Sequence, residues 1–168
     1  MDDYRNLIIR AYGGMAARDF TFVSEARQEE RYASLLVRLR RQVKVTDVTN
    51  WEEDVAYRLG IDTSRPGWVL WLSLVGPFAV IHEGWSRNST PRPSSIYPPH
   101  RPVDVDVSSI IDTVESFSLR FLAVHELLRP IDFVSVQGET PVPLYRALFT
   151  DEEAAFDFLG QESSGGSS

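Results

Sequence analysis

The chain has no cysteine among its 168 residues. That absence excludes a disulfide framework, thiolate zinc sites and cysteine nucleophiles together. The chain also has few positive charges. It contains 17 Lys and Arg residues and 24 Asp and Glu residues, which gives a formal net charge of -7. A nucleic-acid interface needs clustered Lys and Arg to neutralise phosphates. The balance therefore argues against DNA or RNA and favours a basic protein as partner.

Long hydrophobic runs are missing as well. No apolar stretch reaches the roughly 20 residues of a transmembrane helix, and the N-terminus opens with two acids instead of a basic signal-peptide region. We therefore expect a cytoplasmic protein that does not contact a membrane. No Gly-rich phosphate loop follows the most apolar strand pattern, and no nucleophile elbow occupies its turn. These absences favour a protein that binds over one that catalyses.

The most apolar segment, WVLWLSLVGPFAVIHEGW over about 68–85, contains two apolar runs that meet at Gly76-Pro77. Because that dipeptide is incompatible with a helix interior, the pattern predicts a buried β-hairpin. Only Ser73 interrupts the first run, which indicates a strand covered on both faces in the middle of a sheet. Trp68 and Trp71 are three residues apart, so we expect them on opposite faces of that strand.

Helical periodicity occurs in two longer segments. Apolar residues recur at helical spacing over about 25–43, with acids near the start and arginines near the end, as the helix dipole prefers. A second apolar face runs over about 109–129, with Ser108 or Ser109 as the expected cap. We expect these amphipathic helices to flank a mostly antiparallel sheet with the hairpin at its centre. The predicted fold class is α+β.

Shorter patterns predict the remaining elements. Thr49-Asn50 followed by Trp51 and two glutamates is a capping-box arrangement, which predicts a short helix that ends near Leu59. The segments 131–136 and 144–149 are typical of strands, and a second capping box at 150–153 predicts a final helix.

Length and composition indicate one domain over 1–160, followed by a disordered Gly/Ser tail over 161–168. Within the domain, the proline-rich segment 86–102 can hold neither a helix nor a ladder. Long loops inside compact domains are usually functional or disordered. We therefore predict a long exposed loop or an irregular edge, and this segment is a candidate contact surface.

Metal or acid–base chemistry has few candidate residues. Of the three histidines, His82 and His125 are each followed by a glutamate. Neighbours on a strand point to opposite faces, and neighbours on a helix diverge by about 100°, so neither pair converges on a metal. We expect His125 to lie on the apolar face of the second helix as a core imidazole.

Acids also gather near the start of the second helix, at Asp104, Asp106, Asp112 and Glu115. A carboxylate pair there could serve acid–base chemistry. Helix N-termini attract acids through the dipole alone, however, and no second cluster completes a cleft. The prediction is therefore no catalytic residue, no metal site and no cofactor.

An aromatic and acidic patch is predicted beside the end of the hairpin. Tryptophan is favoured both in cores and at the centres of protein interfaces, and an indole next to the proline-rich loop is a candidate for partial exposure. Nearby acids would steer a basic partner toward it. The predicted partner-binding residues are Trp85, Glu83, Ile96, Tyr97, Asp104 and Asp106.

An acidic, cysteine-free domain that combines the WVLWLSLVGPFAVIHEGW hairpin with a closing PLYRALFTDEEA segment resembles the small α+β immunity-type proteins encoded beside bacterial polymorphic toxins. The resemblance implies a cytoplasmic inhibitor that occupies the active site or substrate path of a cognate toxin. Such toxins are often basic nucleases, and the inhibitor binds them through acidic and aromatic surface.

Two other hypotheses stay open. The same outline is similar to secretion chaperones, which act as dimers and hold an unfolded effector segment in apolar grooves. A stable monomer that captures one folded partner would favour the inhibitor, whereas concentration-dependent dimerisation would favour the chaperone. The third hypothesis is a small metal-dependent or acid–base enzyme that uses His82, His125 or Asp104.

Overall fold

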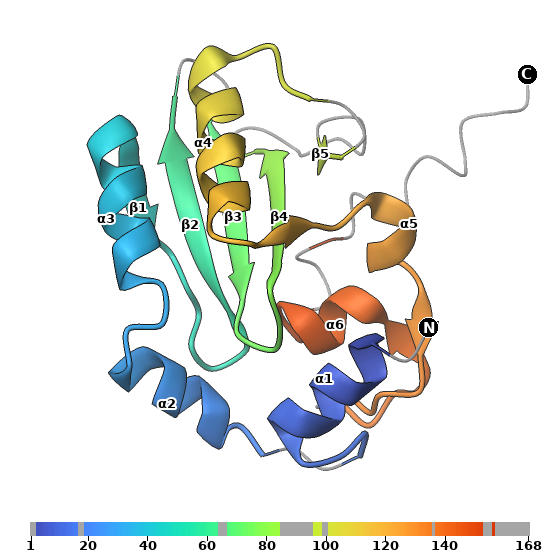
Figure 1. Cartoon of the computed structure of the whole chain (residues 1–168). Coiled ribbons are helices and arrows are strands. Elements are labelled where there is room, and N and C mark those ends of the chain that lie inside the picture. The colour runs from blue at the N-terminus through green and yellow to red at the C-terminus, as the bar shows by residue number, and fades with distance from the viewer. Residues whose placement is uncertain are drawn as a thin grey trace, which may run out of the picture.

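A computed structural model of the chain shows an α+β fold in which helices surround a mostly antiparallel sheet, as predicted (Figure 1). Among the described residues, no helix has the length and apolar character needed to cross a bilayer. Trp85, His100 and the segment 161–168 lie outside the described part of the chain, as does most of the proline-rich segment. The residues described are 3–16, 19–63, 67–84, 96–98, 101–135, 137–152 and 156.

The main sheet has six strands within the described residues. Five of them follow one another in antiparallel order: β1 (Lys44–Asp47), β2 (Ala56–Asp62), β3 (Trp68–Ser73), β4 (Phe78–Glu83) and β5 (Ile96–Tyr97). The sixth, β6 (Arg120–Phe121), runs parallel to β4. It pairs with Phe78 and Ala79, whereas β5 pairs with Ile81 and His82, so two short strands share one edge of β4. The prediction that the proline-rich segment holds no ladder is therefore wrong at Ile96–Tyr97.

The predicted hairpin is confirmed as the centre of this sheet. Strands β3 and β4 pair antiparallel from Trp68 opposite Glu83 to Leu72 opposite Ala79. Strands β2 and β4 pair with the two edges of β3. All six residues of β3 are buried, and because successive side chains point to opposite faces, both of its faces are covered. A continuous apolar run is typical of such a strand, since neither of its faces meets water.

The helices are α1 (Asp3–Tyr12), α2 (Thr21–Gln28), α3 (Ala33–Gln42), α4 (Val105–Ser116), α5 (Val124–Leu127) and α6 (Leu144–Leu148). Helices α3 and α4 lie side by side over one face of the sheet (Figure 1). The amide of Gln42 joins them by donating to the Thr113 hydroxyl at 2.8 Å.

The C-terminal segment, whose described residues are 144–152 and 156, covers the opposite face of the sheet. Tyr57 and Arg58 are neighbours on β2 and therefore point to opposite faces. The Tyr57 ring meets Tyr32, which precedes α3, whereas Arg58 lies over Trp71, whose indole meets the ring of Phe156. The sheet is therefore packed on both faces, and the core extends through it.

The helix predicted over 25–43 is broken in the structure. Helices α2 and α3 are separated by a turn in which Glu30 has a φ of 48°. Side chains in the turn bind the end of β3 and the turn after it, because Arg31 donates to the Leu74 carbonyl and Tyr32 to the Ser73 carbonyl, each at 2.5 Å. These hydrogen bonds stabilise the break between the helices. Their partners are distant in sequence, so the local hydrophobic periodicity could not predict them.

The helix predicted over 109–129 is also wrong in its bounds. It begins at Val105, because the Asp104 carboxylate caps it by accepting from the amides of Asp106 and Val107. It ends at Ser116, and Ser118 adopts a φ of 62°. The chain then turns into β6, and α5 is a separate short helix, because sheet pairing on β4 competes with helix continuation.

Two shorter predictions are wrong in type. The segment after Asn50 forms a turn and then β2, because its backbone pairs with both β1 and β3. The segment 144–149 forms α6 instead of a strand, and its five helical residues are all buried. Short apolar runs do not distinguish a buried strand from a buried helix.

Other short elements are smaller than predicted. The strand expected over 131–136 is reduced to β7 (Pro130–Ile131), which pairs with β8 (Val142–Pro143). The predicted final helix falls mostly outside the described residues, within which Thr150 instead bridges to Asp54.

Candidate functional site

The loop Trp51–Asp54 connects β1 to β2 and is held from behind by the C-terminal segment. The Val55 amide donates to the Phe149 carbonyl at 2.9 Å, and the Asp151 amide donates to the Glu53 carbonyl at 3.1 Å. Between these bonds, Asp54 forms an isolated antiparallel bridge with Thr150. Two segments far apart in the sequence thereby give the loop a defined backbone conformation.

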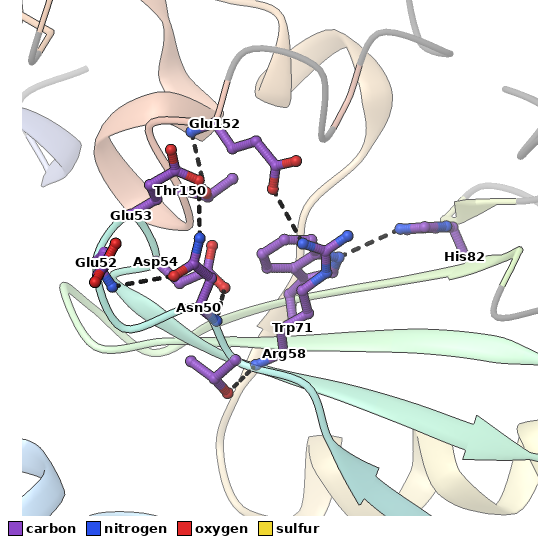
Figure 2. A network of polar contacts seen from close by, with 10 residues as sticks. Asn50, Glu52, Glu53, Asp54, Arg58, Trp71, His82, Thr150 and Glu152 are labelled. Carbon is purple, nitrogen blue, oxygen red and sulfur yellow. Dashed lines mark hydrogen bonds and ion pairs between the residues drawn. The ribbon is translucent and has the colours of Figure 1, made fainter. Parts of the chain in front are cut away.

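Asn50, which directly precedes the loop, organises it through three hydrogen bonds (Figure 2). Its backbone amide donates to Asp54 Oδ2 at 2.8 Å, and its side-chain oxygen accepts from the Glu52 amide at 3.3 Å. Its side-chain amide donates to Glu53 Oε2 at 3.0 Å. These are the local bonds of a capping residue, here closing a turn instead of starting a helix. The side chains of Glu52 and Glu53 are left exposed.

Asp54 is the buried acid of the loop, with 2% of its surface exposed. Among the described residues its Oδ1 atom has no hydrogen-bond partner. Burial raises the pKa of this carboxyl above its ordinary value, although hydrogen bonds with the Thr150 side chain and the Asn50 amide oppose the shift. Asp54 therefore helps to hold the loop conformation, and removing its carboxylate from water carries a desolvation cost.

A second polar group lies behind the loop, on the sheet face that Phe156 covers. The Arg58 guanidinium stands 4.7 Å from the centre of the Trp71 ring and donates to Glu152 at 3.0 Å. Figure 2 shows the guanidinium between that carboxylate and the indole. The indole N–H of Trp71 in turn points to His82. These contacts tie β2, β3 and β4 to the C-terminal segment.

His82 is part of this packing and is unsuited to acid–base chemistry at neutral pH. Its ring is 4% exposed, and burial lowers its pKa to about 4. Nε2 accepts from Trp71 at 3.3 Å, so Nδ1 carries the proton and donates to the Glu83 carbonyl at 2.7 Å. Both ring nitrogens are therefore engaged in the core of the sheet.

Three hollows flank the loop. One is a cavity of about 70 Å³ between the loop, the Tyr12 and Phe133 rings and Arg146. A second, of about 230 Å³, lies between the loop and α2. The third, of about 360 Å³, lies between α3, β1 and the Trp51 ring. Phe20, 40% exposed, lines both of the first two.

We call the side chains around these hollows the loop surface, comprising Phe20, Arg27, Trp51, Glu52 and Glu53; Trp51 is half-buried and the other four are exposed. The Arg27 guanidinium stacks 4.5 Å from the Trp51 ring centre, and the two glutamates line a hollow with this pair. Among the described residues, neither Glu52 nor Glu53 forms an ion pair. Both carboxylates are therefore open to solvent, and the Arg27 guanidinium lines one of the same hollows.

The predicted patch beside the hairpin lies at the other end of the sheet. Ala56, which follows the loop, pairs with Ser73, whereas Glu83 pairs with Trp68 at the far end of β3. Glu83 is half-buried there. The expected exposure of Ile96 is wrong, because its side chain packs in the core with 1% exposed. Trp85 lies outside the described residues.

Two other residues of that patch, Tyr97 and Asp104, have partners within the protein. Tyr97 packs its ring against Phe121 and donates its hydroxyl to Glu115 at 3.2 Å. Asp104 caps α4, while Asp106 is exposed in the first turn of that helix. Asp112 forms an ion pair with Arg101. Most of these acids therefore stabilise α4 and its neighbours.

His125 does not lie on the apolar face of a long helix. It is exposed on the short helix α5, because the chain leaves the helical path after Ser116. In the described part of the chain, no group of three or more His, Asp or Glu side chains could hold a metal ion. His82 and His125 occupy different environments, one inside the sheet and one at the surface.

Sequence reasoning missed the loop surface because it assigned Trp51, Glu52 and Glu53 to the first turn of a helix. The signal that could have found it is the alternation that begins right after them, AYRLGI, which is typical of a strand. An aromatic residue and two acids before a strand belong to a loop.

Comparison with protein families, with curated proteins and with solved structures finds no match to this chain.

Proposed function

We propose that this chain is a non-catalytic protein-binding domain of the immunity type, a cytoplasmic inhibitor that binds and neutralises a basic protein toxin. The observation that carries the proposal is the loop surface. There the exposed carboxylates of Glu52 and Glu53 line hollows that also contain aromatic residues, and within the described residues neither acid forms an ion pair. Aromatic anchors inside an acidic rim are suited to a partner rich in Arg and Lys.

Rigidity of the loop supports binding. The backbone bonds from Val55 and Asp151 and the Asn50 side chain fix its conformation before any partner arrives. A preordered surface loses less conformational entropy on association than a flexible one does. The net charge of -7 adds long-range attraction for a basic protein.

The test is affinity capture with the intact chain from a lysate of its native host at low and moderate salt, with bound proteins identified by mass spectrometry. The supporting result is one basic protein, held at equal stoichiometry, weakened by salt, and less toxic when co-expressed with this chain. A chain that dimerises and captures flexible effector termini would instead favour the secretion chaperone. Absence of a partner at both salt concentrations would contradict the proposal and favour the hypothesis of a small enzyme.

Matched charge reversals locate the contact. Replacing Glu52 and Glu53 by Lys should reduce capture at least tenfold, whereas the same change at the exposed acids Glu25 and Glu29 should reduce it far less. Asp106→Lys examines the patch predicted at the other end of the sheet. If it alone abolishes capture, the contact lies at that patch and the loop surface is not the interface.

A further inference from the structure

We infer that the cavity of about 70 Å³ beside Glu52 and Glu53 receives the guanidinium group of an arginine side chain from the partner. This inference rests on the proposed function and identifies the chemical group that the partner inserts. The cavity is larger than the roughly 10–15 Å³ that one water molecule needs, so it can admit the head group of a side chain.

Aromatic rings form part of the cavity wall, from Tyr12, Phe20 and Phe133. The Tyr12 ring centre lies 4.8 Å from that of Phe133 and 5.6 Å from that of Phe20. The Tyr12 hydroxyl donates to the Ala147 carbonyl at 2.9 Å, which fixes the ring between α1 and α6. A planar guanidinium stacks on such rings better than an ammonium group does.

The rim of the cavity carries the negative charge. Glu52 and Glu53 line it from the loop, and Glu53 keeps one carboxylate oxygen beyond its bond with Asn50. Carboxylates above aromatic faces are the surroundings that a desolvated guanidinium requires, because they accept its N–H groups while the rings cover its plane. An apolar side chain would use the rings and leave these charges unpaired.

Arg146 lines the same cavity, and its charge is already balanced. Its guanidinium is buried and forms ion pairs with Glu139 and, at 2.7 Å, with Asp151. It also donates to Gln137 at 2.5 Å. With those partners in place, Arg146 adds little repulsion to an entering cation. It is also a poor receptor for an anion, since its donors are engaged.

The direct probe is a capped tripeptide, acetyl-Gly-Arg-Gly-amide, titrated into ¹⁵N-labelled chain while amide shifts are recorded by NMR. We expect saturable shifts at Phe20, Glu53 and Val134, with a Kd of about 1–10 mM for one inserted side chain. The citrulline peptide has the same shape without the charge and should bind at least tenfold more weakly. The norleucine and aspartate peptides should cause no shifts there.

Variants separate the cavity from general acidity. Glu52→Gln with Glu53→Gln should weaken the arginine peptide at least fivefold, while Glu25→Gln with Glu29→Gln removes equal charge elsewhere and should leave its binding unchanged. Phe20→Ala should weaken it as well, with the remaining amide spectrum preserved as evidence of folding. Equal binding of the norleucine or citrulline peptide, or absence of localised shifts, would overturn the inference.

The two proposals can fail separately. If a basic partner is captured through Glu52 and Glu53 but the arginine peptide causes no localised shift, the inference is wrong and the proposed function stands. If the peptide binds in the cavity and no partner is captured at either salt concentration, the proposed function is wrong.

Discussion

The indole N–H of Trp71 donates to Nε2 of His82 across the β3–β4 pair, at 3.3 Å between the two nitrogens. This bond selects the His82 tautomer that carries its proton on Nδ1, because a protonated Nε2 would confront another donor. The Glu83 carbonyl accepts from Nδ1 at 2.7 Å. The neutral imidazole is therefore fixed from both sides inside the sheet.

The first prediction concerns pH. The folded-state pKa of His82 is lowered from 6.5 to about 4, so the unfolded chain takes up this proton first as the pH falls. The contribution of His82 to stability is present above pH 6.5 and is lost toward pH 4, at about 1.4 kcal/mol per pH unit and roughly 3 kcal/mol in all.

Urea unfolding of the wild type and of His82→Gln at pH 7, 6, 5 and 4 measures this contribution. The glutamine oxygen can still accept from Trp71, so the variant keeps the bond but does not titrate. The difference in free energy of unfolding between the two proteins should shrink as the pH falls. Parallel curves across the four pH values would refute the buried neutral imidazole.

Trp71 should be sensitive to small changes. Trp71→Ala should lower the free energy of unfolding by about 3–5 kcal/mol, since it empties a fully buried site and removes the ring beneath Arg58. Trp71→Phe keeps much of the volume but leaves His82 Nε2 without its donor, which should cost about 1–3 kcal/mol beyond packing.

Trp68→Phe is the matched control for that second change. Trp68 lies on the same strand and is also buried, so the substitution tests loss of packing on the opposite face. Chemical denaturation of the three variants should rank Trp71→Ala as least stable. If Trp68→Phe and Trp71→Phe are equally stable, the bond to His82 contributes nothing.

Asp54→Asn should stabilise the protein. The amide retains an oxygen that can accept from the Asn50 amide, while the desolvated charge is removed. The pKa of Asp54 is raised on folding, so the ionised form is disfavoured in the native state at neutral pH. We expect the free energy of unfolding to rise by about 1 kcal/mol at pH 7.

The sign of that effect can be checked by its pH dependence. The gain from Asp54→Asn should diminish as the pH falls toward 4, because the wild-type carboxyl then becomes protonated and loses its desolvation cost. Thermal unfolding at pH 7 and pH 4.5 gives both values. A variant less stable than the wild type at pH 7 would show that the carboxylate is compensated in its buried position.

Arg146 should be essential for folding. Arg146→Met removes a buried guanidinium and leaves Glu139 and Asp151 without their counter-charge, so we expect a loss of about 3–5 kcal/mol. Arg146→Lys keeps the charge but not the planar fork, and should recover only part of that loss. Equilibrium unfolding measures the free energy of unfolding of both variants. If only side-chain volume mattered, Arg146→Met and Arg146→Lys would be equally stable.

The capping residues show where local pattern and structure agree. Asn50 makes side-chain bonds to the following residues, as its position before two glutamates predicted, yet no helix follows it. The bonds were predictable because they involve neighbours within three residues. The outcome was not, because β1 and β3 offer the next segment two ladders of backbone hydrogen bonds that a short helix cannot match.

The broken helices have a related cause. Tyr32 lies on a helical period, but its hydroxyl reaches the carbonyl of Ser73, 41 positions along the chain. Phe121 likewise fitted a helical face and instead lies in β6, paired with β4. In each case the competing partner is distant in sequence, so a window of neighbouring residues contains no record of it.

Sequence alone determined the α+β class, the central hairpin and its burial, because unbroken apolar runs divided by Gly76-Pro77 have few stable alternatives to paired, covered strands. The acidic character of the chain was equally available from its residue counts. Only the tertiary structure decided which acids are free. Asp104 caps a helix and Asp54 is buried, whereas Glu52 and Glu53 stay exposed because the C-terminal segment folds back behind their loop. Whether a carboxylate is compensated depends on atoms within a few ångströms, and folding brings those atoms from anywhere in the chain.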